Sequence, residues 1–303
     1  MEVVQNMIGA PRNLMLRAAT GLEGGCVAHG ATCGLVTGGS LGLALAHQKA
    51  LERGDTAAET ALLGRVGEYV KWFEASFGSA YCRKCTRVDF YTLSGQLRYL
   101  MPGDKVAGCM ARVRGAARYL HETVDRALPV PGDPPGASAT GPARHCAREV
   151  LRAIREKTGL GDPYLETASV ALDGGTGLSG GLCGALAGAI LGVNLLLGLD
   201  VRNTPYTGII RAFLAGHVNL LLDDTSRKRE PFAVGRGVVS RFKQAAGALT
   251  CAAVTGKRFA SREDFQVHMG ASEQCEKLIR HAADLATGEI EKWRDPENEG
   301  PTR

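Results

Sequence analysis

The sequence lacks the features typical of secreted and nucleic-acid-binding proteins. Aromatic residues make up only 6% of its 303 residues, and a net charge of +5 with a pI near 8.7 is less basic than a typical nucleic-acid-binding domain. Residues 1–5 carry no basic segment followed by an apolar stretch, so no secretory signal is recognisable. We therefore expect a cytoplasmic protein that does not bind nucleic acid.

Cysteine is too scarce for a fold held together by disulfides. The chain has nine cysteines, an odd number and far below the roughly 8–10% of residues found in small disulfide scaffolds. In a reducing cytoplasm these thiols are free for redox or metal chemistry. The cysteines are therefore candidates for function rather than for cross-links.

Long charge-free segments are also rare. Residues 178–199 carry no charge and are long enough to span a membrane. They contain six glycines, Cys183 and Asn194, however, and no aromatic or basic anchors flank them. We expect a buried helix here rather than a membrane span.

What the sequence does contain is an internal repeat rich in glycine. Residues 22–42 align with 172–192 at an offset of 150, and nine of the 21 positions are identical. Residues 70–82 align with 239–251, and residues 109–117 align with 275–283. Three cysteines recur in order in these blocks: Cys33, Cys82 and Cys109 match Cys183, Cys251 and Cys275.

A proline-rich segment separates the two copies. Residues 129–138 include four prolines and can neither continue a helix nor pair as a strand. We predict a first Cys/Gly-rich helical repeat, a linker, a second repeat and a polar tail. Their bounds are 1–128, 129–142, 143–293 and 294–303.

Apolar residues at three- and four-residue spacing predict an all-α fold. The expected helices are 57–78, 105–127, 143–157, 205–222, 236–250 and 268–293, and 88–93 is the one short strand candidate. Two further helices, 34–47 and 184–199, carry glycine at every fourth position, which lets another backbone approach closely. We expect the repeats to pack as a pseudo-symmetric pair around these Gly-rich helices, either against each other or each against its own partner helix.

The second half holds four cysteines, Cys146, Cys183, Cys251 and Cys275. Four thiols can complete one tetrahedral metal site or bind one iron–sulfur cluster. Cys33 and Cys183 stand at helix starts, where backbone N–H groups lower a thiol pKa, so they are also candidate redox thiols.

The order Cys146, then Cys183–Gly188 (CGALAG), then Cys251, then Cys275 resembles a family of redox-active proteins named for the pattern C, GCAxxG, C, C. The resemblance implies a small helical unit of redox function, in some members linked to membrane transport, and similar to a thiol-rich domain of split-Soret cytochromes. It implies iron–sulfur chemistry, with the four cysteines as ligands. The glycines of the two motifs, Gly34, Gly38, Gly184 and Gly188, are then candidate cofactor-binding positions.

The first half departs from this pattern, because it starts too late to include the leading cysteine. Cys33, Cys82 and Cys109 are present, and either Cys26 or Cys85 is expected to supply the fourth thiol. Cys82 and Cys85 form a CxxC pair, but Thr86 follows where covalent haem attachment requires histidine. No covalent haem is expected.

Three functions remain open on the sequence alone. The leading hypothesis is electron transfer through Cys-ligated iron–sulfur clusters, and the alternative is thiol–disulfide exchange by low-pKa Cys33 or Cys183. A structural zinc protein that binds a partner is the third. Whether the protein is an enzyme, which redox partner it meets, and whether it is a monomer or a homodimer are not determined.

Overall fold

The structure, a computed structural model, describes residues 1–126, 143–221 and 230–294. Sixteen α-helices and two short 3₁₀ helices lie within these residues, which contain no β-strand and only two isolated β-bridges. The all-α prediction is confirmed, and the strand candidate 88–93 is a turn leading into a helix. The predicted linker 129–142 and the tail after Arg294 lie outside the described residues.

The first half begins with short helices, continues with a buried Gly-rich helix and a long helix, and ends with three helices that carry cysteines or flank them. Their bounds are α1 (Glu2–Met7), α2 (Asn13–Ala19), η1 (Thr20–Leu22), α3 (Gly34–Ala46), α4 (Gln48–Glu52), α5 (Thr56–Phe77), α6 (Cys82–Thr86), α7 (Leu93–Leu100) and α8 (Asp104–Thr123).

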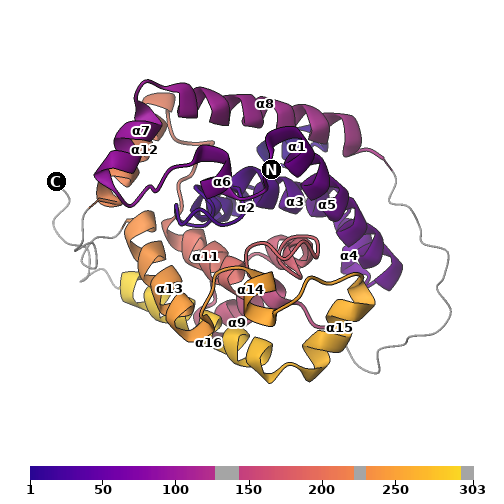
Figure 1. Ribbon diagram of the computed structural model, residues 1–303. Coiled ribbons are helices and arrows are strands. Elements are labelled where there is room, and N and C mark those ends of the chain that lie inside the picture. The colour runs from indigo at the N-terminus through magenta and orange to yellow at the C-terminus, as the bar shows by residue number, and fades with distance from the viewer. Residues whose placement is uncertain (127–142, 222–229, 295–303) are drawn as a thin grey trace.

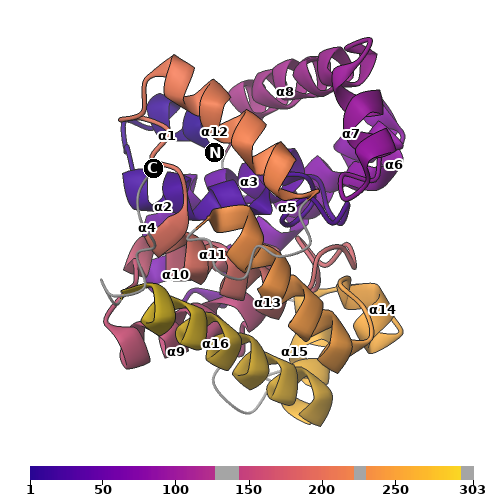
Figure 2. The same ribbon diagram turned by 90° about the vertical axis from the view of Figure 1, so that its left-hand side faces the viewer.

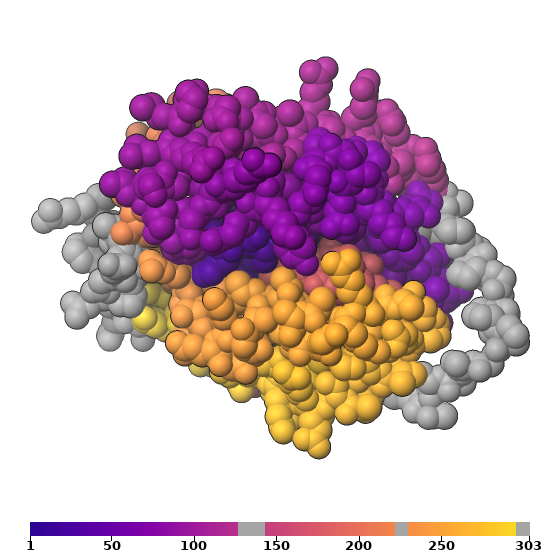
Figure 3. Space-filling model, in the orientation of Figure 1, coloured from indigo at the N-terminus to yellow at the C-terminus, as the bar shows by residue number. Residues whose placement is uncertain are grey.

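The second half repeats this order, with a longer first helix and with α12 in the place of the shorter α4. Its helices are α9 (Cys146–Thr158), α10 (Pro163–Ala168), η2 (Ser169–Leu172), α11 (Gly184–Leu197), α12 (Tyr206–Asn219), α13 (Pro231–Ala246), α14 (Cys251–Thr255), α15 (Arg262–Ala271) and α16 (Glu273–Arg294). In Figure 1 the first half lies above and the second below, apart from α12, which lies beside α7 at the upper left, and the halves meet along their length in Figure 3.

Two predicted helix boundaries were wrong because of capping side chains. The predicted helix 268–293 is divided into α15 and α16, since the Ser272 hydroxyl accepts a hydrogen bond from the Cys275 N–H and starts a new helix. α13 begins at Pro231, five residues before the predicted start, because the Glu230 carboxylate accepts from the N–H groups of Phe232 and Ala233.

The most unusual element is a left-handed loop that occurs once in each half. Residues 24–28 and 30 have positive φ, and so do residues 174–178 and 180, at the repeat offset. Each loop is followed by one isolated bridge, Thr32 to Tyr81 and Leu182 to Thr250. Positive φ is strained for side chains such as Val27 and Leu178, so the surrounding packing must hold both loops in place.

The two halves pack reciprocally, as expected for a pseudo-symmetric pair. A Cβ added to Gly235 of α13 would touch Val27 of the first loop, and one added to Gly177 of the second loop would touch Val66 of α5. Val27 and Gly177 are equivalent positions of the two loops, and Val66 and Gly235 are equivalent positions of α5 and α13. Each half therefore makes the same contact with the other. The Thr32 hydroxyl also accepts a 2.7 Å hydrogen bond from the Leu182 N–H across the interface.

The Gly-rich helices α3 and α11 are buried, and each contacts short helices of the other half. The glycines of α11 face α9 of their own half: a Cβ at Gly184 would meet the Cys146 Cβ at 2.9 Å, and one at Gly192 would meet Ile154 at 2.4 Å. The second of the two packing arrangements expected from the sequence is therefore present. None of the helices within the described ranges is long and apolar enough to span a bilayer.

One pair of equivalent glycines tests this packing. A Cβ at Gly188 would lie 2.8 Å from the Ala147 carbonyl oxygen, which as a backbone atom cannot rotate away. Gly188→Ala should therefore lower the free energy of unfolding, measured by urea denaturation, by about 1–3 kcal/mol. Gly38, its equivalent in α3, has no atom within 4 Å of the added Cβ. Gly38→Ala should be neutral or stabilise by up to about 1 kcal/mol, and equal losses in the two variants would contradict this account.

Candidate redox site

The four second-half cysteines come from four helix starts. Cys146 and Cys251 are the first residues of α9 and α14, Cys183 precedes α11 directly, and Cys275 is in the first turn of α16. Burial raises the pKa of Cys146 well above its ordinary value, Asp173 raises it further, and so do the charges of the other three thiols. The structure therefore gathers the second thiol site, Cys146, Cys183, Cys251 and Cys275, in one neighbourhood.

Backbone hydrogen bonds hold this site together. The Cys183 N–H donates to the Leu249 carbonyl at 2.9 Å, and the Cys251 N–H donates to the Gly181 carbonyl at 2.7 Å, so the starts of α11 and α14 are tied side by side. The Cys146 N–H donates to Asp173 Oδ1 at 3.1 Å. Gly184 and Gly188, predicted as cofactor-binding positions, instead provide the space that α9 occupies with Cys146 and Ala147.

The first thiol site repeats these bonds. The Cys33 N–H donates to the Ala80 carbonyl and the Cys82 N–H to the Ala31 carbonyl, both at 2.8 Å. Burial raises the pKa of Cys82 most, and the charges of Cys33, Cys109 and Cys85 raise it further. Cys33 and Cys109 pack against the apolar cluster that contains Cys82, and the guanidinium of Arg112 contacts both Cys109 Sγ and the Cys85 carbonyl. These four cysteines are called the first thiol site below.

Cys26 lies apart from this group. It belongs to the left-handed loop, its side chain is completely buried, and no hydrogen bond to its thiol is present among the described residues. Burial raises its pKa, and the one thiol that adds to this shift is Cys183 of the other half. Cys85, by contrast, is linked to Cys109 through Arg112.

Helix α12 of the second half covers part of the first thiol site. Leu220, which follows α12, is buried in a small apolar cluster with Cys82, Phe90 and Tyr99, and Phe213 packs against this cluster. His217 is hydrogen-bonded through Nδ1 to Gln96 Oε1 at 2.6 Å. Figure 2 shows α12 lying beside helices of the first half. The second half thus contributes to the surroundings of the first site.

The expectation that Cys33 and Cys183 have lowered pKa values was wrong. Burial raises the pKa of Cys183 to about 11, although the N–H groups of Leu186 and Ala185 lower it in part. Burial likewise raises the pKa of Cys33 to about 11, although the N–H of Leu35 lowers it in part. The helix starts do favour the thiolate, but removal from water outweighs them.

A buried network of charges, not anticipated from the sequence, adjoins Cys146. His145 Nδ1 lies 2.7 Å from Asp173 Oδ2, and His145 Nε2 lies 3.3 Å from Glu59 Oε1. Arg262 Nη2 lies 2.6 Å from Glu59 Oε2. Burial alone would lower the pKa of His145, but the two carboxylates raise it to about 9. The network joins α5 of the first half to the second thiol site.

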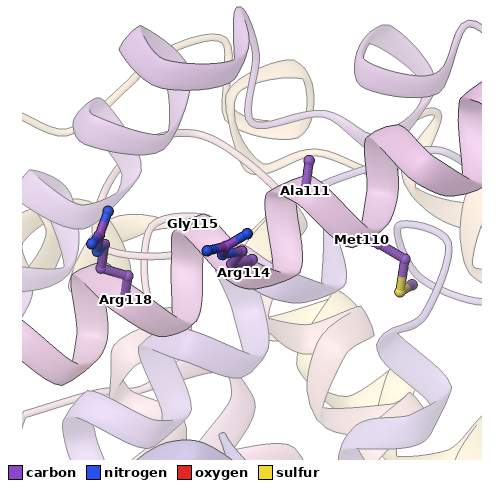
Figure 4. A pocket seen from close by; sticks show the side chains of 5 residues that line it. All are labelled: Met110, Ala111, Arg114, Gly115 and Arg118. Carbon is purple, nitrogen blue, oxygen red and sulfur yellow. The ribbon is translucent and has the colours of Figure 1, made fainter.

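The described residues contain no three His, Cys, Asp or Glu side chains placed to hold a single metal ion. The tetrahedral arrangement expected from the sequence, with sulfurs within about 4 Å of one another, is therefore not found there. Nor do the two best-formed surface pockets include a cysteine. The larger, about 570 Å³, lies along α8 at Met110, Ala111, Arg114, Gly115 and Arg118 (Figure 4), and the other lies along α12.

The chain matches one known protein family, once in each half. Residues 1–123 and again 144–288 match the family described as "Putative redox-active protein (C_GCAxxG_C_C)". The chain belongs to this family. The C_GCAxxG_C_C unit therefore occurs twice in tandem, as the repeat predicted. No curated protein and no solved structure matches the chain significantly.

Proposed function

We propose that this C_GCAxxG_C_C protein transfers electrons, and that each thiol site holds one iron–sulfur cluster. The observation that supports the proposal is that in each half the backbone joins two helix starts that carry cysteines, α11 to α14 and α3 to α6, although these lie far apart in sequence. Cysteine thiolates in sets of four are the usual ligands of such clusters. Cys33, Cys82, Cys85 and Cys109 would hold one cluster, and Cys146, Cys183, Cys251 and Cys275 the other.

Two properties of the donor set support the proposal. All nine cysteines are unpaired, and burial together with the neighbouring thiol charges raises the pKa of those at the centre of each site. Bound iron would replace the thiol protons and offset the crowded negative charge. In a cluster of two or four irons the four thiolates are shared among the irons, so the thiols need not converge on a single ion. When bound, the cluster would accept and release one electron at a time.

The chain itself supplies burial and hydrogen bonds. Cys183 and Cys251 are buried, and the N–H groups of Ala185 and Leu186 favour a thiolate at Cys183. Such donors and exclusion of water are what set the reduction potential of a thiolate-bound cluster. The ties between the starts of α11 and α14, and between those of α3 and α6, keep the ligands in place when charge changes.

Iron and acid-labile sulfide assays on anaerobically reconstituted protein test the proposal. We expect both elements, in amounts that correspond to two clusters per chain. Protein that binds zinc alone, or that carries no metal and shows reversible oxidation of Cys33 or Cys183 by differential alkylation, would overturn it. The latter outcome would support thiol–disulfide exchange instead.

A further inference from the structure

Large apolar side chains are exposed mainly at one end of the molecule. Thirteen of them are exposed within residues 1–126, 143–221 and 230–294, and ten of these belong to α7, α8, α12 or the residue after α7. Scattered single apolar residues are normal on a protein surface, but a cluster of them marks an interaction site. The outer sides of these three helices are therefore a candidate interaction surface.

The three helices are neighbours that share one interior (Figure 1, Figure 2). His217 of α12 stacks on Tyr99 of α7, with ring centroids 5.6 Å apart. Val106 of α8 and Phe213 of α12 pack against the apolar cluster that contains Tyr99. Because their inner sides meet on this cluster, their outer sides adjoin one another, and together they are called the α7–α8–α12 surface below.

Helix α12 exposes an apolar stripe along most of its length. The stripe consists of Tyr206, Ile210, Leu214 and Val218, at four-residue steps that follow one side of a helix. Each of these side chains is between 43% and 77% exposed. Since Phe213 already packs α12 against the shared interior, the stripe does not serve to hold the helix on the fold.

The second half shows that the repeated fold does not require exposed apolar residues here. α15 and α16 are the counterparts of α7 and α8. All three leucines of α7 are exposed, whereas α15 exposes one large apolar side chain, Val267. In the aligned blocks, the exposed Met110 of α8 corresponds to Glu276 of α16.

The same three helices carry most of the net positive charge of the chain. They contain six arginines and lysines and two acidic residues, a formal charge of +4 against +5 for the whole chain. Arg98, Arg114 and Arg211 are exposed, and neither of the pockets described along α8 and α12 is lined by an acidic residue. Like charges oppose contact with a second copy of this surface, so the occupant that fits it is both apolar and anionic.

We propose that the α7–α8–α12 surface binds the face of a bilayer that contains anionic lipids. The apolar side chains would enter between the lipid headgroups, and the arginines beside them would pair with phosphate groups. A bilayer suits this surface better than a protein partner does, because each pocket is lined by a single helix and offers no groove between helices. Binding of this kind needs no metal at either thiol site.

Co-sedimentation of the purified chain with vesicles tests this proposal. We expect binding to vesicles of phosphatidylcholine mixed with phosphatidylglycerol, and a loss of binding as salt is raised. Vesicles of phosphatidylcholine alone should bind the chain at least about tenfold more weakly. A chain that does not bind the anionic vesicles, or binds both kinds equally, would overturn the proposal.

Matched variants of the two halves locate the contact. Leu214→Glu places a carboxylate in the α12 stripe and should lower binding to the anionic vesicles by about tenfold, whereas Val267→Glu, at an exposed residue of the second half, should bind like wild type. Arg114→Gln should lower binding by about fivefold, and Arg280→Gln, at the aligned position of α16, should leave it unchanged. Circular dichroism verifies that each variant is folded.

Two further outcomes would contradict the proposal. Equal losses in Leu214→Glu and Val267→Glu would show that binding does not depend on this surface. A dimer in sedimentation equilibrium without lipid, which Leu214→Glu dissociates while the wild type binds no vesicles, would make the surface an interface between two copies of the chain.

Discussion

Replacing Cys183 with serine should remove about half of the bound iron and sulfide and leave the first site loaded. Cys183 is a member of the second thiol site, and its backbone ties the start of α11 to α14. A neutral hydroxyl is a poor substitute for a soft thiolate ligand. The measurement is iron and sulfide per chain after anaerobic reconstitution, with circular dichroism to verify that the variant is folded.

Two matched variants control this result. Cys33→Ser makes the same change at the equivalent position and should remove the other half of the iron, leaving the second site loaded. Cys26→Ser alters a cysteine that lies outside both sites and should retain the full amount. Loss of all iron in either Cys183→Ser or Cys33→Ser would mean that the two sites are not independent.

Replacing Glu59 with alanine should destabilise the protein by about 3–5 kcal/mol. The carboxylate of Glu59 is buried between Arg262 and His145, and its removal leaves two buried cationic side chains without this partner. Urea denaturation of the metal-free protein would measure the change. Glu68→Ala, in the same helix, removes a carboxylate that is 67% exposed and should cost less than about 1 kcal/mol.

The same network gives stability a pH dependence. The carboxylates of Asp173 and Glu59 outweigh burial and raise the pKa of His145 from 6.5 to about 9. Because the folded state binds this proton more tightly than the unfolded state, the contribution is fully present below about pH 6.5 and is lost as the pH rises through about 9. Glu59→Ala should flatten this decline. An unchanged decline in the variant would place its origin in other groups.

The helical repeat could be predicted from the sequence because it depends on local patterns. Glycine at four-residue steps and cysteines in matched contexts report directly on close helix packing and on a duplicated site. The division of α15 from α16 was missed because one hydroxyl, that of Ser272, decides it. Such a cap is weak evidence in a sequence whose apolar spacing continues across it.

The details of the sites depend on tertiary structure, which spacing does not reveal. Cys26 and Cys85 were equivalent candidates until the left-handed loop placed Cys26 beside the other half. The thiol pKa values could not be foreseen, because burial depends on α9, α12 and both loops together. The Glu59 network joins residues more than 80 positions apart.

X-ray absorption at the iron edge of the reconstituted protein tests the central claim most directly, that each half gathers its four thiols around one polynuclear centre. We predict a first shell of sulfur alone and a second shell of iron, and we expect the same two shells around the remaining iron, at half the iron content per chain, in Cys183→Ser and in Cys33→Ser. A first shell with nitrogen or oxygen ligands, or sulfur ligands without an iron neighbour, would contradict the account.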